Sequence, residues 1–286
     1  MKKTEVGIIG QGFVGKALKF GFEKYYTTNT FDIKEYCNCE SIDELVDKSN
    51  IIFVCVPTPM KKDGNCDTSI VESVVKEIDE LVVYRNVSNR VVVIKSTIPP
   101  GTTERLNKEC KHIQVVFNPE FLTEANYIED FKNQNRIILG GPRPGITKVK
   151  RFYSKIFPKI TIVKTGSTIA EMVKYTTNTF LATKVSFANE IKMISDELGI
   201  DYDKVVEYAT YDDRLGKSHW SVPGPDEKLG FGGSCFPKDL RAMIKLAEKL
   251  DVSANVLFSV WDTNLDVRPE EDWNELKGRA VVAEKA

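Results

Sequence analysis

The sequence predicts an α/β protein: a Rossmann-type, doubly wound and mostly parallel sheet, followed by a long central helix and a small all-helical domain. Three observations lead to this prediction. An apolar run over residues 5–10 ends in a glycine-rich turn, further β-branched runs recur at the spacing of strand–helix–strand units, and residues 168–198 contain neither Gly nor Pro. A helix of about 45 Å is too long for an ordinary crossover, so we expect it to join two domains, residues 1–166 and 167–286.

The turn after the first strand carries a dinucleotide-binding fingerprint. It reads Gly10-Gln11-Gly12-Phe13-Val14-Gly15 and is followed by residues of helical character. Such glycines allow a tight bend and a close approach of the pyrophosphate to the helix N-terminus. Asp32 ends the next predicted strand, residues 28–32, and lies 22 residues after Gly10. Its carboxylate can accept hydrogen bonds from the ribose hydroxyls and repels a 2′-phosphate, so we expect NAD as the cofactor; a turn aspartate is the alternative reading.

Five further apolar runs predict strands, over residues 51–56, 90–94, 114–117, 136–139 and 159–163. Near-continuous apolar strands that alternate with amphipathic segments, such as residues 68–83, indicate a parallel sheet covered on both faces. Ligands of such sheets bind beyond the carboxyl ends of the strands. The polar residues expected there are Thr58, Ser96, Thr97, Asn118 and Glu120. We interpret them as site candidates, although each alone is also ordinary loop chemistry.

Composition argues against several classes of function. The 286 residues include 40 basic and 41 acidic ones, a net charge of −1, and without a basic run no nucleic-acid partner is expected. The six cysteines form no CxxC pair and the two histidines, His112 and His219, lie far apart in the sequence, so we expect neither a metal site nor a disulfide framework. The N-terminus has no signal-peptide pattern and no apolar run reaches about 18 residues, so we expect a cytoplasmic protein without a membrane partner.

One stretch of the chain combines glycines with a cysteine. It reads Gly230-Phe231-Gly232-Gly233-Ser234-Cys235-Phe236-Pro237-Lys238-Asp239-Leu240. We expect the three glycines to let the backbone bend and approach a ligand, and a helix to begin near Pro237. Cys235 then lies at the helix N-terminus next to Lys238, where the pKa of its thiol is lowered and a nucleophilic thiolate forms. A buried cysteine in a glycine-rich turn is the alternative reading.

The long helix carries two polar residues on one face. Lys174 and Asn178 are four residues apart and therefore project from that face about one turn from each other. A solvated surface lysine is the alternative reading of Lys174. Further helices are predicted over residues 203–209, after Cys235, and over residues 254–266. We expect the long helix to pair two chains into a homodimer.

Seven motifs follow one another along the chain. They are the fingerprint with Asp32, Val56-Pro57-Thr58-Pro59, Lys95 to Thr102, Asn118 to Glu124, Lys174 to Phe180, Asp213-Arg214-Leu215-Gly216 and Gly230 to Asp239. In this order they resemble the UDP-glucose/GDP-mannose dehydrogenase family over residues 1 to about 265, and they look most like its UDP-glucose branch. Each motif alone is weak, but the ordered set is specific.

The resemblance implies a twofold oxidation of a sugar-nucleotide primary alcohol to a carboxylate with two NAD⁺, UDP-glucose becoming UDP-glucuronate. By this analogy the Cys235 thiolate attacks the intermediate aldehyde and gives a thiohemiacetal and then a thioester. Lys174 and Asn178 match the positions that stabilise the developing oxyanion. Glu120 matches the base of thioester hydrolysis, and Asp239 matches a residue that holds, together with Thr97, a water assisting the first deprotonation.

The same resemblance assigns binding residues. We expect cofactor contacts from Gly10, Gly12, Phe13, Val14, Gly15, Asp32, Thr58, Ser96, Thr97 and Glu124, of which the resemblance itself implies those of Asp32, Thr97 and Glu124. The implied substrate residues are Phe121, Leu122, Thr123, Glu124, Lys174, Asn178, Arg214, Gly232 and Phe236, Arg214 often reaching its substrate across a dimer. The substrate is expected to be a UDP-sugar.

One departure from the family pattern keeps alternatives open. Family members continue into a second α/β domain that holds the nucleotide, whereas residues 276–282 only resemble the approach to its first strand, so we expect a short form without the UDP-binding domain. GDP-mannose and UDP-N-acetyl sugars are alternative substrates. A non-catalytic NAD-binding partner of a full-length homologue is a second alternative, and a hydroxyacid or phosphogluconate-type dehydrogenase is a third.

Overall fold

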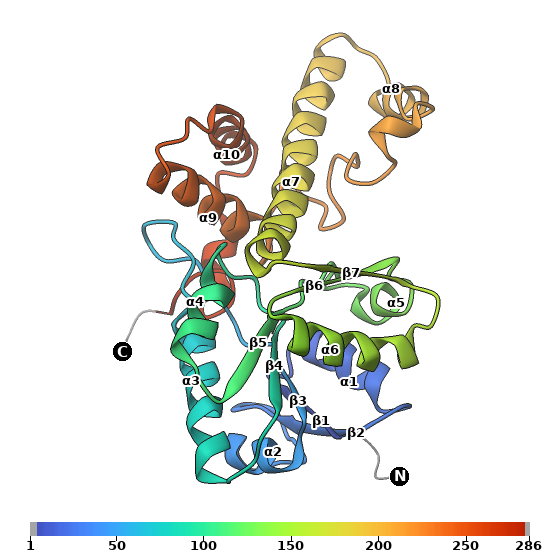
Figure 1. Ribbon diagram of the computed structural model, residues 1–286. Helices are drawn as coiled ribbons and strands as arrows, with labels where there is room; N and C mark the ends of the chain where they lie inside the picture. Colours follow the sequence, from blue (N-terminus) through green and yellow to red (C-terminus); the bar gives the residue numbers. More distant parts are fainter. Residues whose placement is uncertain (1–4, 284–286) are drawn as a thin grey trace. The chain divides into compact units, whose positions relative to one another are not determined.

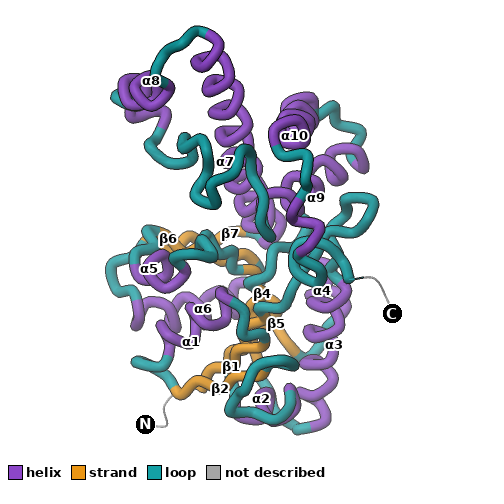
Figure 2. Tube along the Cα trace, turned by 180° about the vertical axis from the view of Figure 1, so that it is seen from behind, coloured by secondary structure: helices purple, strands orange, loops and turns teal. Residues whose placement is uncertain are grey.

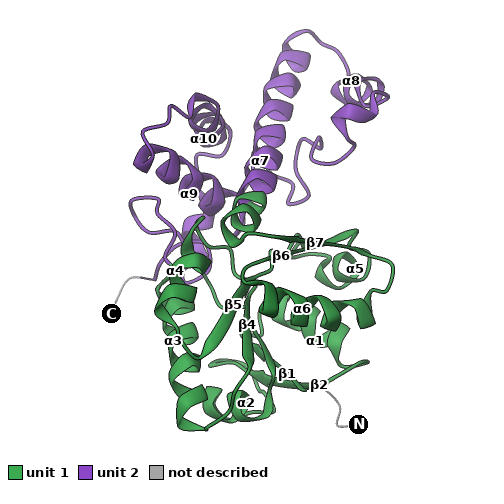
Figure 3. Ribbon diagram, viewed as in Figure 1, with its two compact units in different colours: residues 1–58, 68–174 green, residues 59–67, 175–286 purple. Residues whose placement is uncertain are grey.

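A computed structural model describes residues 5–283, which divide into two units (Figure 3). Within that range the first unit comprises residues 5–58 and 68–174, and the second comprises residues 59–67 and 175–283. The change from one unit to the other therefore falls inside the long helix. The predicted division into residues 1–166 and 167–286 stays a prediction about domains.

The first unit is built on a seven-stranded sheet of order β2-β1-β3-β4-β5-β6-β7. The strands are β1 (Glu5–Ile9), β2 (Thr27–Phe31), β3 (Ile51–Val54), β4 (Arg90–Ile94), β5 (Ile113–Phe117), β6 (Arg136–Gly140) and β7 (Thr161–Thr165). All neighbours pair in parallel except β5 and β6, which are antiparallel and joined by one pair of residues, Phe117 and Gly140. The predicted mostly parallel sheet and its strands are confirmed.

Helices cover both faces of this sheet (Figure 1). One face packs against α2 (Ile42–Lys48), α3 (Ser69–Tyr84) and α4 (Thr102–Glu109), and the other against α1 (Phe13–Phe22), α5 (Tyr127–Lys132) and α6 (Arg143–Ile156). Successive strand residues alternate between the two cores: Ile52 and Val54 belong to one, Ile51 and Phe53 to the other. Burial on both faces explains the continuous apolar runs in the sequence.

The order of the strands indicates where a ligand crevice is expected in this sheet. Strand β1 lies between β2 and β3, so the chain changes direction across the sheet beside β1. In open parallel sheets this switch point, at the carboxyl ends of the strands, is where ligands bind. The turn at Gly10 follows β1 directly, and the loops that follow β3, β4 and β5 lie at the same edge because these strands are parallel.

The second unit is helical (Figure 2). It contains most of α7 (Ser167–Glu197), then α8 (Tyr202–Ala209), α9 (Phe236–Lys249) and α10 (Asn255–Val267), with short 3₁₀ turns at Asp213–Leu215 and Asp272–Glu275. These confirm the long helix and the helices predicted after it. The core of the second unit includes Met60, Leu240, Ile244 and Trp273. Among residues 5–283, no helix combines the length and apolar character needed to cross a membrane.

Candidate active site

The three glycines of the β1–α1 turn serve different purposes. Gly10 has φ +92°, and a Cβ there would lie 2.5 Å from the Cys55 carbonyl oxygen. A Cβ on Gly15 would lie 1.9 Å from the carbonyl oxygen of Gly10, so both positions require glycine for the turn to close. A Cβ on Gly12 would have no heavy atom within 4 Å. Gly12 therefore leaves exposed backbone, at the start of α1, open to a ligand, as a pyrophosphate group requires.

Asp32 is held as a carboxylate at the end of β2. Its Oδ2 accepts the Gln11 N–H at 2.6 Å, and its Oδ1 accepts the Lys34 N–H at 2.7 Å. Partial burial opposes ionisation, but these backbone hydrogen bonds outweigh it and hold the pKa of Asp32 below its usual value. Helix α1 has no acidic residue in its first turn and no side-chain cap at Gly12. These residues fit NAD: the backbone from Gly12 to Val14 would hold the phosphates, and Asp32 would accept hydrogen bonds from the ribose hydroxyls.

Replacing Gly12 by Ala tests this cofactor site. The added methyl group meets no protein atom, so we expect an unchanged melting temperature. It occupies the space that the pyrophosphate needs, so we expect NAD affinity to fall about tenfold, measured by calorimetric titration. Gly166→Ala, where a Cβ is equally free of contacts, is the matched control. An NAD affinity that is unchanged in Gly12→Ala contradicts this assignment.

The loops after β3 and β4 hold three of the predicted residues. Thr58 and Thr97 are buried, with 4% and 8% of their surfaces exposed. Ser96 is half-buried and donates its hydroxyl to the Val56 carbonyl oxygen at 2.6 Å, which ties the two loops together. The structure thus places these residues at the predicted edge of the sheet, and their contacts with NAD remain predictions.

Glu120 and Lys174 form a buried ion pair. Lys174 Nζ lies 2.9 Å from Glu120 Oε1 and donates to the Glu120 carbonyl oxygen at 2.8 Å. Their side chains are 8% and 4% exposed, so the reading of Lys174 as a solvated surface lysine is wrong. Burial raises the pKa of Glu120, but the charge and hydrogen bond of Lys174 outweigh this and hold it below its usual value. The ring of Phe121 lies under the same ammonium, 5.5 Å from Nζ.

Sequence reasoning missed Lys95. This buried lysine donates to Asn118 Oδ1 at 3.1 Å and to the Pro119 carbonyl oxygen at 3.2 Å. Burial lowers its pKa to about 8, although the neighbouring Glu120 charge acts in the opposite direction. The available signal was a lysine directly after the apolar run of β4, at the carboxyl edge of the sheet. Asn118 Oδ1 also accepts a hydrogen bond from the Tyr153 hydroxyl at 2.8 Å, so this side chain is bonded within the protein.

A cavity of about 260 Å³ gathers several residues of the predicted site. Its lining includes Glu120, Phe121, Leu122 and Thr123, together with Lys95. The first four come from one predicted motif, and Lys95 reaches them from the neighbouring strand. The cavity therefore lies beside the carboxyl end of β5 and has a mixed polar and apolar lining.

The second unit contains Cys235 as the residue that precedes α9. Its side chain is half-buried, and its Sγ lies 3.9 Å from the Ser234 hydroxyl. Nearby, the buried Asp239 carboxylate accepts the Asn178 amide at 2.6 Å and pairs with Lys238. Burial favours the neutral amine of Lys238, but the charges of Asp239 and of Cys235 hold the pKa of Lys238 above its usual value. A cation therefore lies in the field of the Cys235 sulfur, as the sequence suggested.

Four predicted substrate residues are exposed or contact other groups of the protein. The Arg214 side chain is 88% exposed and pairs with Asp212. Glu124 is exposed, and the Thr123 hydroxyl donates to Asp130 at 2.6 Å. Phe236 is half-buried and packs against Phe231, with ring centroids 6.0 Å apart. Substrate contacts by these residues remain predictions.

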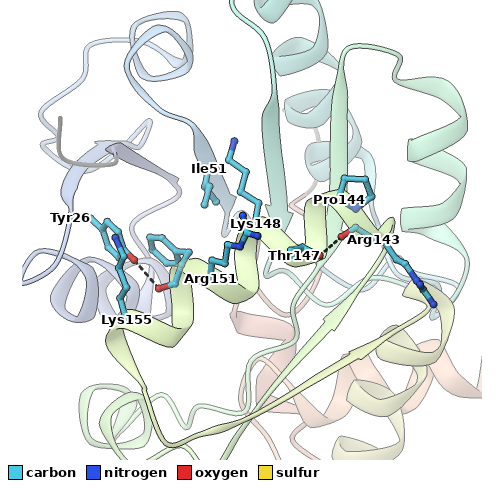
Figure 4. A pocket seen from close by; sticks show the side chains of 9 residues that line it. Tyr26, Ile51, Arg143, Pro144, Thr147, Lys148, Arg151 and Lys155 are labelled. Atoms are coloured by element: carbon cyan, nitrogen blue, oxygen red, sulfur yellow. Dashed lines mark hydrogen bonds between the residues drawn. The ribbon is translucent and has the colours of Figure 1, made fainter. Parts of the chain in front are cut away.

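A separate cavity of about 540 Å³ lies along α6 (Figure 4). Four basic residues of that helix line it, Arg143, Lys148, Arg151 and Lys155, together with Tyr26 and Ile51. Ile51 begins β3, so this cavity lies toward the amino ends of the strands and contains none of the predicted site residues. Within residues 5–283 no group of three or more His, Cys, Asp or Glu side chains is placed to hold a metal ion.

Both halves of the chain match domains of one known family. Residues 24–160 match the NAD binding domain of the UDP-glucose/GDP-mannose dehydrogenase family, and residues 168–266 match the central domain of that family. The chain is 34% identical over 230 residues to the UDP-glucose 6-dehydrogenase TuaD of Bacillus subtilis (strain 168), covering 78% of this chain and 48% of that protein. It is 33% identical over 233 residues to a GDP-mannose 6-dehydrogenase of Pseudomonas syringae pv. tomato, covering 77% and 52%. The chain thus spans about half the length of these relatives.

Solved structures show the same fold. A UDP-glucose dehydrogenase from the hyperthermophilic archaeon Pyrobaculum islandicum superposes with a TM-score of 0.83 at 29% identity, covering 92% of this chain and 68% of that one. A 3-hydroxyisobutyrate dehydrogenase of Mycobacterium tuberculosis superposes with a TM-score of 0.72 at 14% identity, covering 94% and 95%. The second likeness concerns the fold alone.

Proposed function

Because the chain belongs to the UDP-glucose/GDP-mannose dehydrogenase family, we propose that it is an NAD-dependent nucleotide-sugar 6-dehydrogenase that oxidises UDP-glucose to UDP-glucuronate. The observation that carries the proposal is a half-buried cysteine, Cys235, directly before α9 and within the field of Lys238. An alcohol-only dehydrogenase needs no such thiolate. Bound NAD⁺ supplies the hydride acceptor for both oxidations.

The first oxidation converts the 6-hydroxyl of the sugar to an aldehyde. The hydroxyl loses a proton and its carbon loses a hydride. We assign the proton to a water held by Asp239 and Thr97. Asp239 suits this role because its buried carboxylate accepts a hydrogen bond from Asn178 and pairs with Lys238, and these two contacts hold it in one orientation.

The second oxidation uses the sulfur of Cys235. The thiolate adds to the aldehyde carbon, which forms a C–S bond and places a negative charge on oxygen. Lys174 and Asn178, one helical turn apart on α7, stabilise that oxyanion. Loss of a second hydride gives the thioester. Water then attacks the thioester carbon, Glu120 takes one proton from the water, and the C–S bond breaks to restore the thiolate and give the carboxylic acid, which loses its proton to solvent as the carboxylate.

The buried ion pair gives these steps an order. While Lys174 is bonded to Glu120, the pKa of Glu120 is held down and its carboxylate is a weak base. When Lys174 turns to the substrate oxyanion, Glu120 loses its partner in a buried place and becomes a stronger base. Stabilisation of the oxyanion by Lys174 therefore prepares Glu120 for the hydrolysis that follows.

Turnover with single sugar nucleotides tests the proposal. We expect two NADH formed for each UDP-glucose consumed, measured by absorbance together with quantification of the uronate. GDP-mannose and UDP-N-acetyl sugars are run in parallel, since relatives that act on GDP-mannose and on UDP-N-acetylmannosamine share this fold. If none of these substrates is oxidised while NAD binding is intact, the non-catalytic NAD-binding partner replaces this proposal.

We also propose that α7 pairs two chains. Phe180, Phe187 and Ile194 recur every seven residues on this helix and are 62%, 49% and 55% exposed. This spacing places them in one row, as at a helix–helix interface. We expect a dimer by analytical ultracentrifugation and a monomer for Phe187→Glu, whereas Lys192→Glu, outside the row, stays dimeric. A monomeric unmodified chain contradicts the pairing.

A further inference from the structure

The loop that leads to Cys235 is held by one residue of α10. Asn264 is fully buried, and its Oδ1 accepts the Phe231 N–H at 2.7 Å. Its Nδ2 donates to the carbonyl oxygen of the same residue at 3.0 Å. One side chain thus satisfies both backbone groups of Phe231, as a neighbouring strand does elsewhere. The Gly230 N–H is bonded to the side chain of Asn189 at 3.2 Å.

Arg268, the residue directly after α10, also contacts this loop. The residue is only 2% exposed. Its guanidinium forms a two-point contact with Asp272, at 2.9 and 2.6 Å, and reaches Asp226 at 2.7 Å. It also donates to the Leu229 carbonyl oxygen at 3.2 Å. Two carboxylates compensate the buried charge, so the planar fork is held in one orientation.

These two side chains explain two of the three glycines. A Cβ on Gly230, which has φ +64°, would lie 2.4 Å from Asn264 Oδ1. A Cβ on Gly232 would lie 2.5 Å from the Arg268 guanidinium. Gly233, with φ +71°, would have no heavy atom near its Cβ. Glycine is therefore required at Gly230 and Gly232 because Asn264 and Arg268 pack there, and the expected approach of a ligand to this loop stays a prediction.

The polar contacts specify one loop conformation. Apolar packing tolerates several arrangements of a glycine-rich segment, whereas a fully satisfied buried polar network does not. The network ends on the Phe231 backbone, four residues before Cys235, and Gly232, Gly233 and Ser234 connect it to the cysteine. A nucleophile displaced by about 1 Å loses on the order of a hundredfold in rate.

We propose that Asn264 and Arg268 are positioning residues for the nucleophile: they hold residues 229–233 so that Cys235 is presented at the start of α9. They act through the backbone of the glycine loop and touch no reacting atom. The inference rests on the proposed function, in which Cys235 carries the covalent step. It adds a structural requirement on α10 that the glycine-cysteine motif alone does not contain.

Asn264→Ala tests the proposal, with Asn255→Ala on the exposed start of α10 as the matched control. We expect the peptide covering residues 229–235 to exchange backbone hydrogens at least about tenfold faster, while α9 and α10 stay protected. We expect kcat to fall about ten- to a hundredfold with the KM values for NAD and sugar nucleotide changed less than about twofold. If the substitution only reduced the amount of folded protein, the active fraction would fall, but the hydrogen exchange of this peptide in the remaining folded protein would be unchanged.

A second measurement needs no substrate and separates failure of this inference from failure of the proposed function. At pH 7 the alkylation of Cys235 by iodoacetamide, followed by peptide mass spectrometry, is expected to slow about fivefold or more in Asn264→Ala, because the sulfur leaves the helix end. Arg268→Lys, which keeps the charge but loses the fork, is expected to give a smaller change in the same direction. If Asn264→Ala shows the same rate of Cys235 alkylation and the same rate of hydrogen exchange in the loop as wild type, the inference is overturned, whether or not the enzyme turns over. An unchanged kcat with a loosened loop also overturns it.

Discussion

Replacing Cys235 by Ser is expected to lower the rate of carboxylate formation at least about a thousandfold. A hydroxyl at this place is not ionised at neutral pH, so the adduct that carries the second oxidation does not form. NAD affinity should stay at the wild-type value, because the predicted cofactor contacts come from the fingerprint turn and Asp32, which this substitution leaves unchanged. The measurement is uronate formed per enzyme under saturating NAD⁺ and UDP-glucose.

Cys66→Ser is the matched control for this prediction. Cys66 is also half-buried in the second unit, and its charge acts on the same lysine, Lys238. The control should keep uronate formation within about twofold of wild type, because no step of the mechanism uses this thiol. Equal rates in Cys235→Ser and in wild type would identify an alcohol-only dehydrogenase, and equal losses in the two variants would show that general disturbance of the unit, rather than the nucleophile, lowers the rate.

Lys174→Met is expected to have the largest effect on stability and a second large effect on rate. Removing the direct partner of the buried ion pair leaves the Glu120 carboxylate with the Leu122 N–H at 2.7 Å and the charge of Lys95 alone, which costs about 3–5 kcal/mol of unfolding free energy at pH 7. Loss of the cation at the oxyanion lowers kcat about a hundredfold or more. Urea unfolding and steady-state kinetics measure the two effects.

The pH dependence distinguishes a lost ion pair from lost packing. In wild type the pKa of Glu120 is below its unfolded value, so the pair adds stability above the unfolded pKa, and that stability is lost as pH falls through the folded pKa. In Lys174→Met we expect burial, the largest influence on Glu120, to outweigh the Leu122 hydrogen bond and the Lys95 charge and to raise the pKa of Glu120, so stability instead falls as pH rises through that pKa. The difference between wild type and variant should therefore grow between pH 4 and pH 8.

Two further variants serve as controls for the stability loss expected in Lys174→Met. Lys174→Met combined with Glu120→Gln removes the orphaned charge and should recover part of the stability at pH 7 but none of the activity. Lys192→Met breaks an exposed pair with Asp196 on the same helix and should cost less than about 1 kcal/mol. A stability loss in Lys174→Met that is independent of pH contradicts the account of this pair.

Local patterns were sufficient to predict the elements of the fold. Strands β1, β3, β4, β5 and β6 are buried, largely apolar runs, and α7 is a segment without Gly or Pro, so neighbouring residues alone define them. The order of the strands was not predictable in the same way. Crossover lengths permit several orders, and the position of β1 between β2 and β3 is decided by which helices fill which face.

The contacts within the site required the structure. Lys174 meets Glu120 across 54 residues, and Asn178 meets Asp239 across 61, so no spacing rule connects them. Lys95 was overlooked because a lysine at the end of a strand reads as a solvated loop residue, whereas here two oxygens hold it in the interior. The sequence also does not distinguish the roles of the glycines. Gly15 is required for a tight turn, whereas Gly12 leaves the backbone open, and both read as glycine in the sequence.

The central claim is that Cys235 becomes covalently bonded to the sugar carbon during the second oxidation. Rapid acid quench followed by peptide mass spectrometry tests it most directly, in wild type and in Glu120→Gln, in which slower hydrolysis should let the thioester accumulate. The account predicts a sugar-nucleotide adduct on the peptide that contains Cys235, formed only when NAD⁺ is present and absent from Cys235→Ser. Uronate produced with no adduct on that peptide at any quench time, in either protein, contradicts it.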